Sequence, residues 1–235
     1  MIESNLQAAT DLDLFQSASR WKRYWAAHVM PYLGESVIEV GAGIGGSTPF
    51  LCDRAQRWVC LEPDRARADR IQSRIGRGEL GPNCEAVNGV LADMPRNELC
   101  DAILYADVLE HIEDDRSELA GAARRLRAGG HLIVLGPAHE WLFSRFDAAI
   151  GHYRRYSKRL LVRLTPEGTE IVTTKYLDSA GMLASTVNRC ILRVDQPSQR
   201  QIAFWDRVIV PISRCIDPLL DFRIGKSVLV VWRRC

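Results

Sequence analysis

The amino-acid sequence predicts an α/β fold in which a doubly wound sheet carries helices on both faces. Short apolar runs rich in β-branched residues recur along its first part, at 37–40, 58–61, about 84–90, 101–106 and 131–135. A glycine-rich turn, Gly41-Ala42-Gly43-Ile44-Gly45, follows the first run directly. Strand-like runs that alternate with stretches long enough for crossover helices favour a largely parallel sheet.

The segment before the first strand predicts a helix from Leu12 to Met30, which Pro31 stops. The aromatic side chains of this helix lie on and around one stripe and comprise Phe15, Trp21, Tyr24 and Trp25. A second helix is expected from about Ser47, directly behind the glycine-rich turn.

The last third of the chain predicts two more strands, Thr169 to Tyr176 and Ser227 to Trp232. Between them, apolar residues recur at helical spacing, namely Ile202, Trp205, Val208, Ile209, Ile212, Ile216 and Leu219. Pro211 predicts a kink or two separate helices there. We expect this region to pack on the sheet or over the substrate, in preference to a membrane-surface or dimer face. No apolar run of about eighteen residues exists, so no transmembrane segment is expected.

Composition limits the classes of function. At 235 residues and 47% hydrophobic content, the chain fits one globular α/β domain. Its 31 Lys and Arg against 29 Asp and Glu give no broad basic surface, so nucleic acid is not an expected partner. The 7 cysteines are scattered without a C-x-x-C pair, and the N-terminus lacks a basic and then apolar signal region. A reduced, cytoplasmic protein is the simplest interpretation.

Acidic residues stand where a nucleoside ligand would meet the predicted sheet. Glu39 ends the first strand, Glu62 ends the second some twenty residues past the glycines, and Asp93 follows the third. Ligands of such sheets bind beyond the carboxyl ends of the strands, and these acids share that rim with Gly41, Asp107 and Pro137. A dinucleotide dehydrogenase fits less well, because its fingerprint needs a further glycine, and no Lys or Arg follows the turn until Arg54.

These landmarks, in this order and at this spacing, resemble the class I S-adenosylmethionine-dependent methyltransferases from about Val37 to Leu135. The resemblance implies a seven-stranded Rossmann-like sheet whose last strand is often reversed. It also implies one domain over 1–235, with a lid or packing helix in 1–31, a cofactor-binding core in 37–135 and substrate-side elements in 136–235. The cofactor would be S-adenosylmethionine, and S-adenosylhomocysteine would be the product.

The resemblance carries roles to individual residues. The methionine part of the cofactor would be held by Glu39, Gly41, Ala42, Gly43 and Gly45. The ribose hydroxyls would meet Glu62, where the family most often has Asp, with Pro63 and Ala106 beside the ligand. The adenine would meet Asp93 and Met94. Taken singly, Glu39 and Asp93 have another interpretation, since each could simply cap a neighbouring turn.

A basic and aromatic segment follows the fifth strand, with His152, Tyr153, Arg154, Arg155 and Tyr156 in succession. A guanidinium pairs well with carboxylate or phosphate, and a nearby His can take a proton at neutral pH. We therefore expect this segment to bind the methyl acceptor, which would be a polar small molecule. The two guanidinium groups would favour an acceptor that carries a negative charge. The alternative is a helix start whose arginines are solvated or pair with Asp147.

Asp107-x-x-Glu110-His111 lies at the end of the fourth strand and could face the later His152. The run resembles that of ubiquinone-pathway O-methyltransferases and small-RNA 2′-O-methyltransferases, in which such residues bind a divalent metal. A metal held by Asp107, Glu110, His111 and His152 would polarise a substrate hydroxyl. Glu-His at this place also occurs in relatives without metal, where it shapes the pocket floor, and metal binding is not the expected interpretation.

Taken together, the sequence predicts a methyltransferase that moves a methyl group from a sulfonium to an oxygen, or less readily a nitrogen, of a polar small molecule. The protein must align the acceptor and remove its proton, for which His111 or His152 is the candidate base. Two alternatives stay open. One is methylation of a lipid-linked or saccharide intermediate at the membrane surface, with the helices of 199–221 as the docking face. The other is a cofactor-binding subunit without catalysis.

Overall fold

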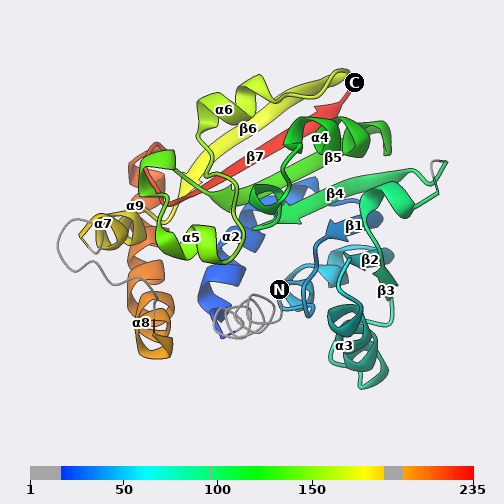
Figure 1. Cartoon of the computed structure of the whole chain (residues 1–235), viewed down its shortest axis with the longest axis horizontal. Coiled ribbons are helices and arrows are strands. Elements are labelled where there is room, and N and C mark those ends of the chain that lie inside the picture. The colour runs from blue at the N-terminus through cyan, green and yellow to red at the C-terminus, as the bar shows by residue number, and fades with distance from the viewer. Residues whose placement is uncertain (1–16, 96, 188–197) are drawn as a thin grey trace.

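The computed structural model describes residues 17–95, 97–187 and 198–235 (Figure 1). The first residues of the predicted N-terminal helix, with Phe15, lie outside the described residues. The described part of that helix is α2, Ser19–Val29, and the 3-10 turn Met30–Tyr32 follows it with Pro31 inside the turn. Every helix within the described residues is too short or too polar to span the hydrocarbon core of a bilayer.

The seven strands form one sheet in the order β3-β2-β1-β4-β5-β7-β6, which confirms the predicted fold. The five strands of the first part pair in parallel, and β7 runs antiparallel to both of its neighbours. The bounds are β1 Ser36–Val40, β2 Arg57–Glu62, β3 Cys84–Asn88, β4 Cys100–Ala106, β5 Leu126–Pro137, β6 Thr169–Leu177 and β7 Ser227–Arg234.

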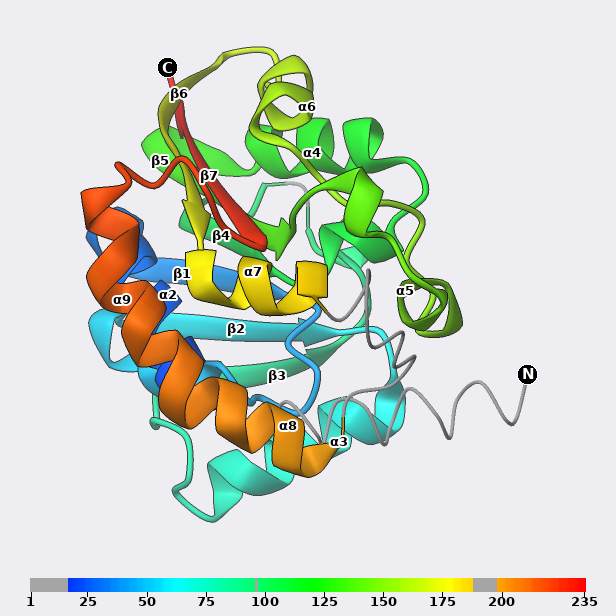
Figure 2. The ribbon, with the colours of Figure 1, turned by 90° about the vertical axis from the view of Figure 1, so that its left-hand side faces the viewer.

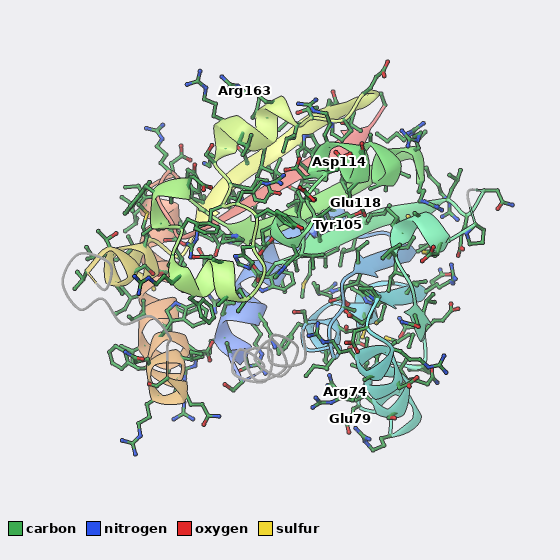
Figure 3. The ribbon with its side chains drawn as sticks, viewed as in Figure 1. Arg74, Glu79, Tyr105, Asp114, Glu118 and Arg163 are labelled. Atoms are coloured by element: carbon green, nitrogen blue, oxygen red, sulfur yellow. The ribbon has the colours of Figure 1, made fainter. Side chains whose placement is uncertain are left out.

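Helices cover both faces of this sheet, as predicted (Figure 1). Neighbouring strand residues point to opposite faces, so Leu104 packs under α2 and the C-terminal helices whereas Ile103 packs under α4 and α6. On the second face, the hydroxyl of Tyr105 on β4 donates a hydrogen bond to Glu118 of α4 at 2.6 Å (Figure 3). The helices are α3 Arg65–Gly76, α4 Asp115–Arg124, α5 Arg145–Ala149, α6 Lys158–Arg163, α7 Ser179–Val187, α8 Gln199–Phe204 and α9 Val210–Leu219.

The helix expected from about Ser47 is absent, and the prediction was wrong there. The chain instead makes two 3-10 turns, Thr48–Phe50 and Cys52–Arg54. About ten residues connect the turn to β2, and they must run back along a strand some 16 Å long. An α-helix would need all ten of these residues to rise roughly 15 Å, and no residue would be left for the turns at its two ends. The tighter turns cover more distance per residue, about 2.0 Å each, and so fit the short connection.

The C-terminal helical region is one continuous rod in which α8, the π turn Trp205–Ile209 and α9 follow without a break (Figure 2). Pro211 lies in the first turn of α9. Proline cannot donate the backbone hydrogen bond of an ordinary helical turn, and the wider π turn before it accommodates this loss. The predicted interruption at Pro211 therefore takes the form of a π turn.

Candidate active site

A cavity of about 1650 Å³ opens at the carboxyl ends of the parallel strands. The glycine-rich turn, Glu62 and the segment after β4 form its floor, and side chains of α2, α5, α7 and α8 form its other walls. A site at this edge is the one that parallel α/β sheets offer to ligands. The cavity is therefore the candidate active site.

The glycine-rich turn has a backbone that only glycine adopts readily. Gly41 and Gly43 have φ angles of 64° and 61°, in the left-handed region that disfavours other residues. A Cβ on Gly41 would lie 2.7 Å from the side chain of Val108. From outside, the guanidinium of Arg74 donates hydrogen bonds to the carbonyls of Ile44 and Gly45 at 2.8 and 2.7 Å, so the turn is held from behind (Figure 3).

The two strand-end glutamates are both buried at the cavity wall and already hold hydrogen bonds. Glu39 accepts from the hydroxyl of Thr48 at 2.7 Å and from the indole of Trp58 at 2.8 Å. Glu62 accepts from the backbone N–H of Gly43 at 2.8 Å. Burial raises the pKa of both carboxyls, and these hydrogen bonds oppose the rise. It is Glu62, and not Glu39, that bonds to the backbone of the glycine-rich turn.

Not every predicted cofactor residue reaches the cavity. Pro63 and Ala106 line it together with Gly41, Ala42 and Gly43. Gly45, Asp93 and Met94 are not among its lining residues. Asp93 accepts a hydrogen bond from the backbone N–H of Val90 at 3.0 Å, and Met94 is buried in the core. Asp93 therefore caps the 3-10 turn in which it lies, which is the alternative role that the sequence left open for it.

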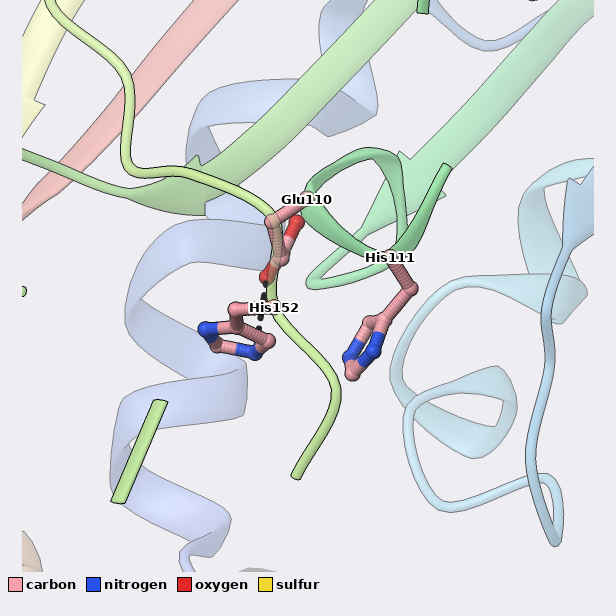
Figure 4. A group of neighbouring side chains, drawn as sticks. All are labelled: Glu110, His111 and His152. Atoms are coloured by element: carbon pink, nitrogen blue, oxygen red, sulfur yellow. Dashed lines mark ion pairs between the residues drawn. The ribbon is translucent and has the colours of Figure 1, made fainter. Parts of the chain in front are cut away.

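Glu110, His111 and His152 meet at the cavity wall (Figure 4). Glu110 and His111 lie in the 3-10 turn Leu109–His111 after β4, and His152 follows α5. The two imidazole rings are edge to face with centroids 4.5 Å apart, and Nε2 of His152 lies 3.8 Å from Oε1 of Glu110. One donor atom of each residue lies within 4.8 Å of the others. Asp107 lines the cavity but is outside this group, which corrects the predicted set of four ligands.

Asp147 fixes the orientation of His152. One of its carboxylate oxygens lies 3.0 Å from Nδ1 of His152, and Arg155 donates to the same carboxylate at 3.0 and 2.9 Å. Burial by itself would raise the pKa of Asp147, but the hydrogen bonds from His152 and Arg155 hold it well below its usual range. An ionised carboxylate only accepts, so Nδ1 of His152 carries a hydrogen, and in the neutral form of the ring the lone pair is on Nε2.

Glu110 is an unusual carboxyl because both of its oxygens are buried without a hydrogen-bond partner among the described residues. Burial, together with the charge of Asp107, raises its pKa well above the usual range. Burial also lowers the pKa of His111 to about 4, so that ring is neutral at physiological pH. Buried polar atoms left without partners are rare in proteins, and a bound ligand, ion or water would satisfy these two oxygens.

The predicted acceptor wall reaches the cavity only in part, since His152 and Arg155 line it and Arg154 and the two tyrosines do not. Arg154 pairs with Asp115 at 2.6 Å, which draws it to another side of the loop. Tyr156 is fully buried and its hydroxyl lies 3.1 Å from the same carboxylate, and Tyr153 is exposed. We correct the prediction for Tyr153, Arg154 and Tyr156.

Several cavity residues were missed because they come from distant parts of the chain. Lys22 lies on α2, and Lys226 stands just before β7 with its ammonium 3.8 Å from the ring centroid of Trp205. Leu142, Phe143 and Phe146 add apolar surface after β5. The aromatic stripe of the N-terminal helix was a usable signal for Trp21, which lines the cavity, but no local pattern marks the two lysines.

Comparisons with known proteins agree with this geometry. Residues 38–134 match the family described as methyltransferase domain. The chain is 30% identical to a demethylmenaquinone methyltransferase of Tropheryma whipplei over 64% of its own length and 59% of that protein. It is 25% identical to a ubiquinone biosynthesis O-methyltransferase of Xylella fastidiosa over 60% of its own length and 54% of that protein. These matches thus span little more than half of each curated relative.

Among solved structures, the fold is similar to that of a putative sarcosine dimethylglycine methyltransferase from Galdieria sulphuraria. The TM-score is 0.61 at 18% identity, and the match covers 90% of this chain and 83% of the other. At this level of identity the likeness extends to the fold alone.

Proposed function

We propose that the chain, whose residues 38–134 match the methyltransferase domain family, transfers the methyl group of S-adenosylmethionine to a hydroxyl oxygen of a polar small molecule. The observation that carries the choice of oxygen is the pair of His152 and Asp147 on the wall of the same cavity as the glycine-rich turn. A hydroxyl must lose its proton during transfer, and this pair supports a base at that place.

The residues fit the cofactor. Gly41 and Gly43 line the cavity with positive φ angles and without side chains, so a ligand can approach the backbone of the turn closely. Glu62 lies beside the turn and fixes it through the N–H of Gly43. When bound, the cofactor supplies an activated methyl group on a sulfonium.

His152 removes the acceptor proton in this proposal. The hydroxyl O–H bond would break and its proton would move to Nε2 of His152. The new bond from oxygen to the methyl carbon would replace the bond from that carbon to the sulfonium sulfur, to which the electron pair returns. Nδ1–H of His152 donates to Asp147 throughout, so the charge of the imidazolium forms beside an ionised carboxylate that is itself paired with Arg155. His111 stays neutral because its buried ring has a lowered pKa, and it shapes the wall beside the base.

The acceptor binds between apolar and charged walls. Leu142, Phe143 and Phe146 offer apolar surface on one side, and on another lies Lys226, whose ammonium is 3.5 Å from the carboxylate of Asp178. The arginines that the sequence assigned to an anionic acceptor are already paired with Asp147 and Asp115. A compact polar molecule with an apolar portion fits this lining better than a multiply charged anion.

A second candidate mechanism uses a divalent cation, and the unpartnered oxygens of Glu110 favour it. Glu110, His111 and His152 would hold the ion, since their donor atoms lie within 4.8 Å of one another. Carboxylate and imidazole are suitable ligands for such ions. A bound cation would lower the pKa of the acceptor hydroxyl in place of a protein base.

The proposed function is tested with labelled S-adenosylmethionine and a panel of small hydroxylated acceptors. The substitution His152→Ala should lower turnover by about 10² to 10⁴, while the affinity for S-adenosylhomocysteine in calorimetry stays nearly unchanged. His131→Ala is the matched control. His131 lies on β5 opposite Arg233 of β7, at the end of this strand pair that is away from the cavity. Full turnover of the His152→Ala protein, or an equal loss in the control, would contradict the proposal.

A further inference from the structure

An unpartnered apolar surface runs along the C-terminal rod of α8, the π turn and α9. Its side chains are all exposed by more than a third, and they are Phe204, Val208, Ile212, Ile216 and Leu219. Leu219 is 84% exposed and Phe204 is 58% exposed. We call this set the apolar ridge. Large apolar side chains that line up in water mark a contact surface more often than isolated ones do.

The ridge is a single line because of the π turn. Side chains four positions apart in an α-helix drift by about 40° at each step, so residues 204 and 216 of an uninterrupted helix would point in directions roughly 120° apart. The wider turn at Trp205–Ile209 takes up part of this drift. The rod lies at the edge of the molecule, with α7 alongside (Figure 2).

The opposite side of the rod is fixed to the protein by buried polar contacts, so the ridge cannot turn inward. Asp206 accepts from the backbone N–H of Trp21 on α2 at 2.8 Å. Asp217 accepts from the hydroxyl of Tyr24 at 2.6 Å and from the N–H of Asp178 at 2.7 Å. Both carboxylates are buried, and a turn of the rod would leave them without these partners.

Within 199–219 the exposed charged residues are all arginines, and the first exposed acid after them, Asp221, pairs with Arg223. Arg200, Arg207 and Arg214 are exposed, and none of them forms an ion pair with any described residue. The acids of the rod, Asp206 and Asp217, are buried, so they do not offset this charge at the surface. Arg200 lies one helical turn before Phe204, on the side of the ridge, and Arg207 directly precedes Val208. Exposed apolar side chains beside these arginines complement a surface that offers hydrocarbon beside negative charge.

From these contacts we propose that the apolar ridge docks the protein on the surface of an anionic phospholipid bilayer. The rod lies in the plane of the interface, with the ridge among the acyl chains and the arginines at the phosphates. Phe204 belongs both to the ridge and to the cavity wall, and Arg200 also lines the cavity, so the docked face includes the cavity mouth. The proposal stands independently of which acceptor is methylated.

The test measures binding of the whole chain to vesicles of phosphatidylcholine alone and of phosphatidylcholine with an equal amount of phosphatidylglycerol. We expect binding to the anionic vesicles and weaker binding to the neutral ones. Ile212→Gln with Leu219→Gln should lower the partition coefficient by about tenfold or more, because two interfacial apolar side chains are lost. Neither of these residues lines the cavity.

Two further variants complete the experiment. Arg200→Gln with Arg207→Gln should lower binding to anionic vesicles by about tenfold or more, at roughly 1 kcal/mol for each basic residue, and leave neutral vesicles unaffected. Val90→Gln with Val162→Gln is the matched control, since these residues are 45% and 46% exposed against 45% for Ile212, and it should bind like the wild type. Circular dichroism verifies the fold of each variant.

Three results would overturn the proposal. The first is no binding of the wild-type chain to either vesicle. The second is an equal loss in the Val90 and Val162 control, which would mean that any exposed apolar residue suffices. The third is a wild-type chain that binds no vesicle and is a dimer in light scattering, while the Ile212→Gln and Leu219→Gln double variant is a monomer. The ridge would then be a contact between two copies.

Discussion

Asp147 is predicted to control turnover without touching the acceptor, and Asp147→Asn tests this. One carboxylate oxygen faces Nε of Arg155 and Nδ1 of His152, and the other accepts from Nη2 of Arg155 and from the hydroxyl and N–H of Ser144. An amide places NH₂ at one of the two oxygens, so at least two donors lose their acceptor. At about 1.5 to 3 kcal/mol for each charge-assisted hydrogen bond, stability falls by roughly 3 to 6 kcal/mol before relaxation.

The effect on turnover has a different origin. If the amide NH₂ faces His152 it donates to Nδ1, and the ring hydrogen then resides on Nε2, where no proton can be accepted. If the amide oxygen faces His152, the imidazolium loses its charged partner. Either arrangement impairs the base, and the expected loss of turnover is about 10² to 10⁴. The affinity for S-adenosylhomocysteine should change little, because Asp147 lies apart from the glycine-rich turn.

The assay combines thermal unfolding, calorimetry with S-adenosylhomocysteine and turnover at a temperature where the variant is fully folded. Glu140→Gln is the control, because Glu140 accepts only from the backbone N–H of Arg155 at 2.9 Å and is exposed. A folded Asp147→Asn protein that turns over as fast as the wild type would refute the reasoning. A loss of turnover explained entirely by weaker cofactor binding would refute it as well.

Three other predictions concern the cofactor wall and the metal. Glu62→Ala should weaken S-adenosylhomocysteine binding about ten- to hundredfold, since a hydrogen bond to a charged group contributes roughly 1.5 to 3 kcal/mol, and calorimetry with unchanged affinity would exclude the role. Gly43→Val should abolish binding in a folded protein, because a β-branched residue is strained at a φ of 61°. Turnover should survive a strong chelator. If the chelator abolishes turnover, and a divalent ion restores it in the wild type but not in Glu110→Gln, a bound cation and not His152 activates the acceptor hydroxyl.

Much of the fold could be predicted because its signals are local. The run Val37 to Val40 is buried and, apart from Glu39, apolar, and the glycines after it need backbone angles that few other residues adopt. Glu62 could be placed for the same reason, since it ends the next buried strand beside the turn. Periodicity and glycine chemistry are properties of a few consecutive residues, and they determine the sheet and the cofactor side of the cavity.

The rest depends on distances that consecutive residues do not encode. The connection after the glycine-rich turn is too short in space for the expected helix, although its composition permits one. Tyr156 and Arg154 had the composition of an acceptor wall, yet both reach Asp115, which lies 41 residues before Tyr156 in the sequence. Lys22 and Lys226 enter the cavity from opposite ends of the chain. The positions of these side chains depend on partners from other helices and strands, which a local sequence pattern does not reveal.

The central claim is methyl transfer to oxygen with His152 as the base. Its most direct test is the structure of the product formed from S-adenosylmethionine with a carbon-13-labelled methyl group, determined by nuclear magnetic resonance for the wild type and for His152→Ala. The wild type should give a labelled methyl ether and His152→Ala almost none, with the cofactor still bound in both. A labelled methyl group on nitrogen or carbon, or an equal yield of ether without His152, would contradict it.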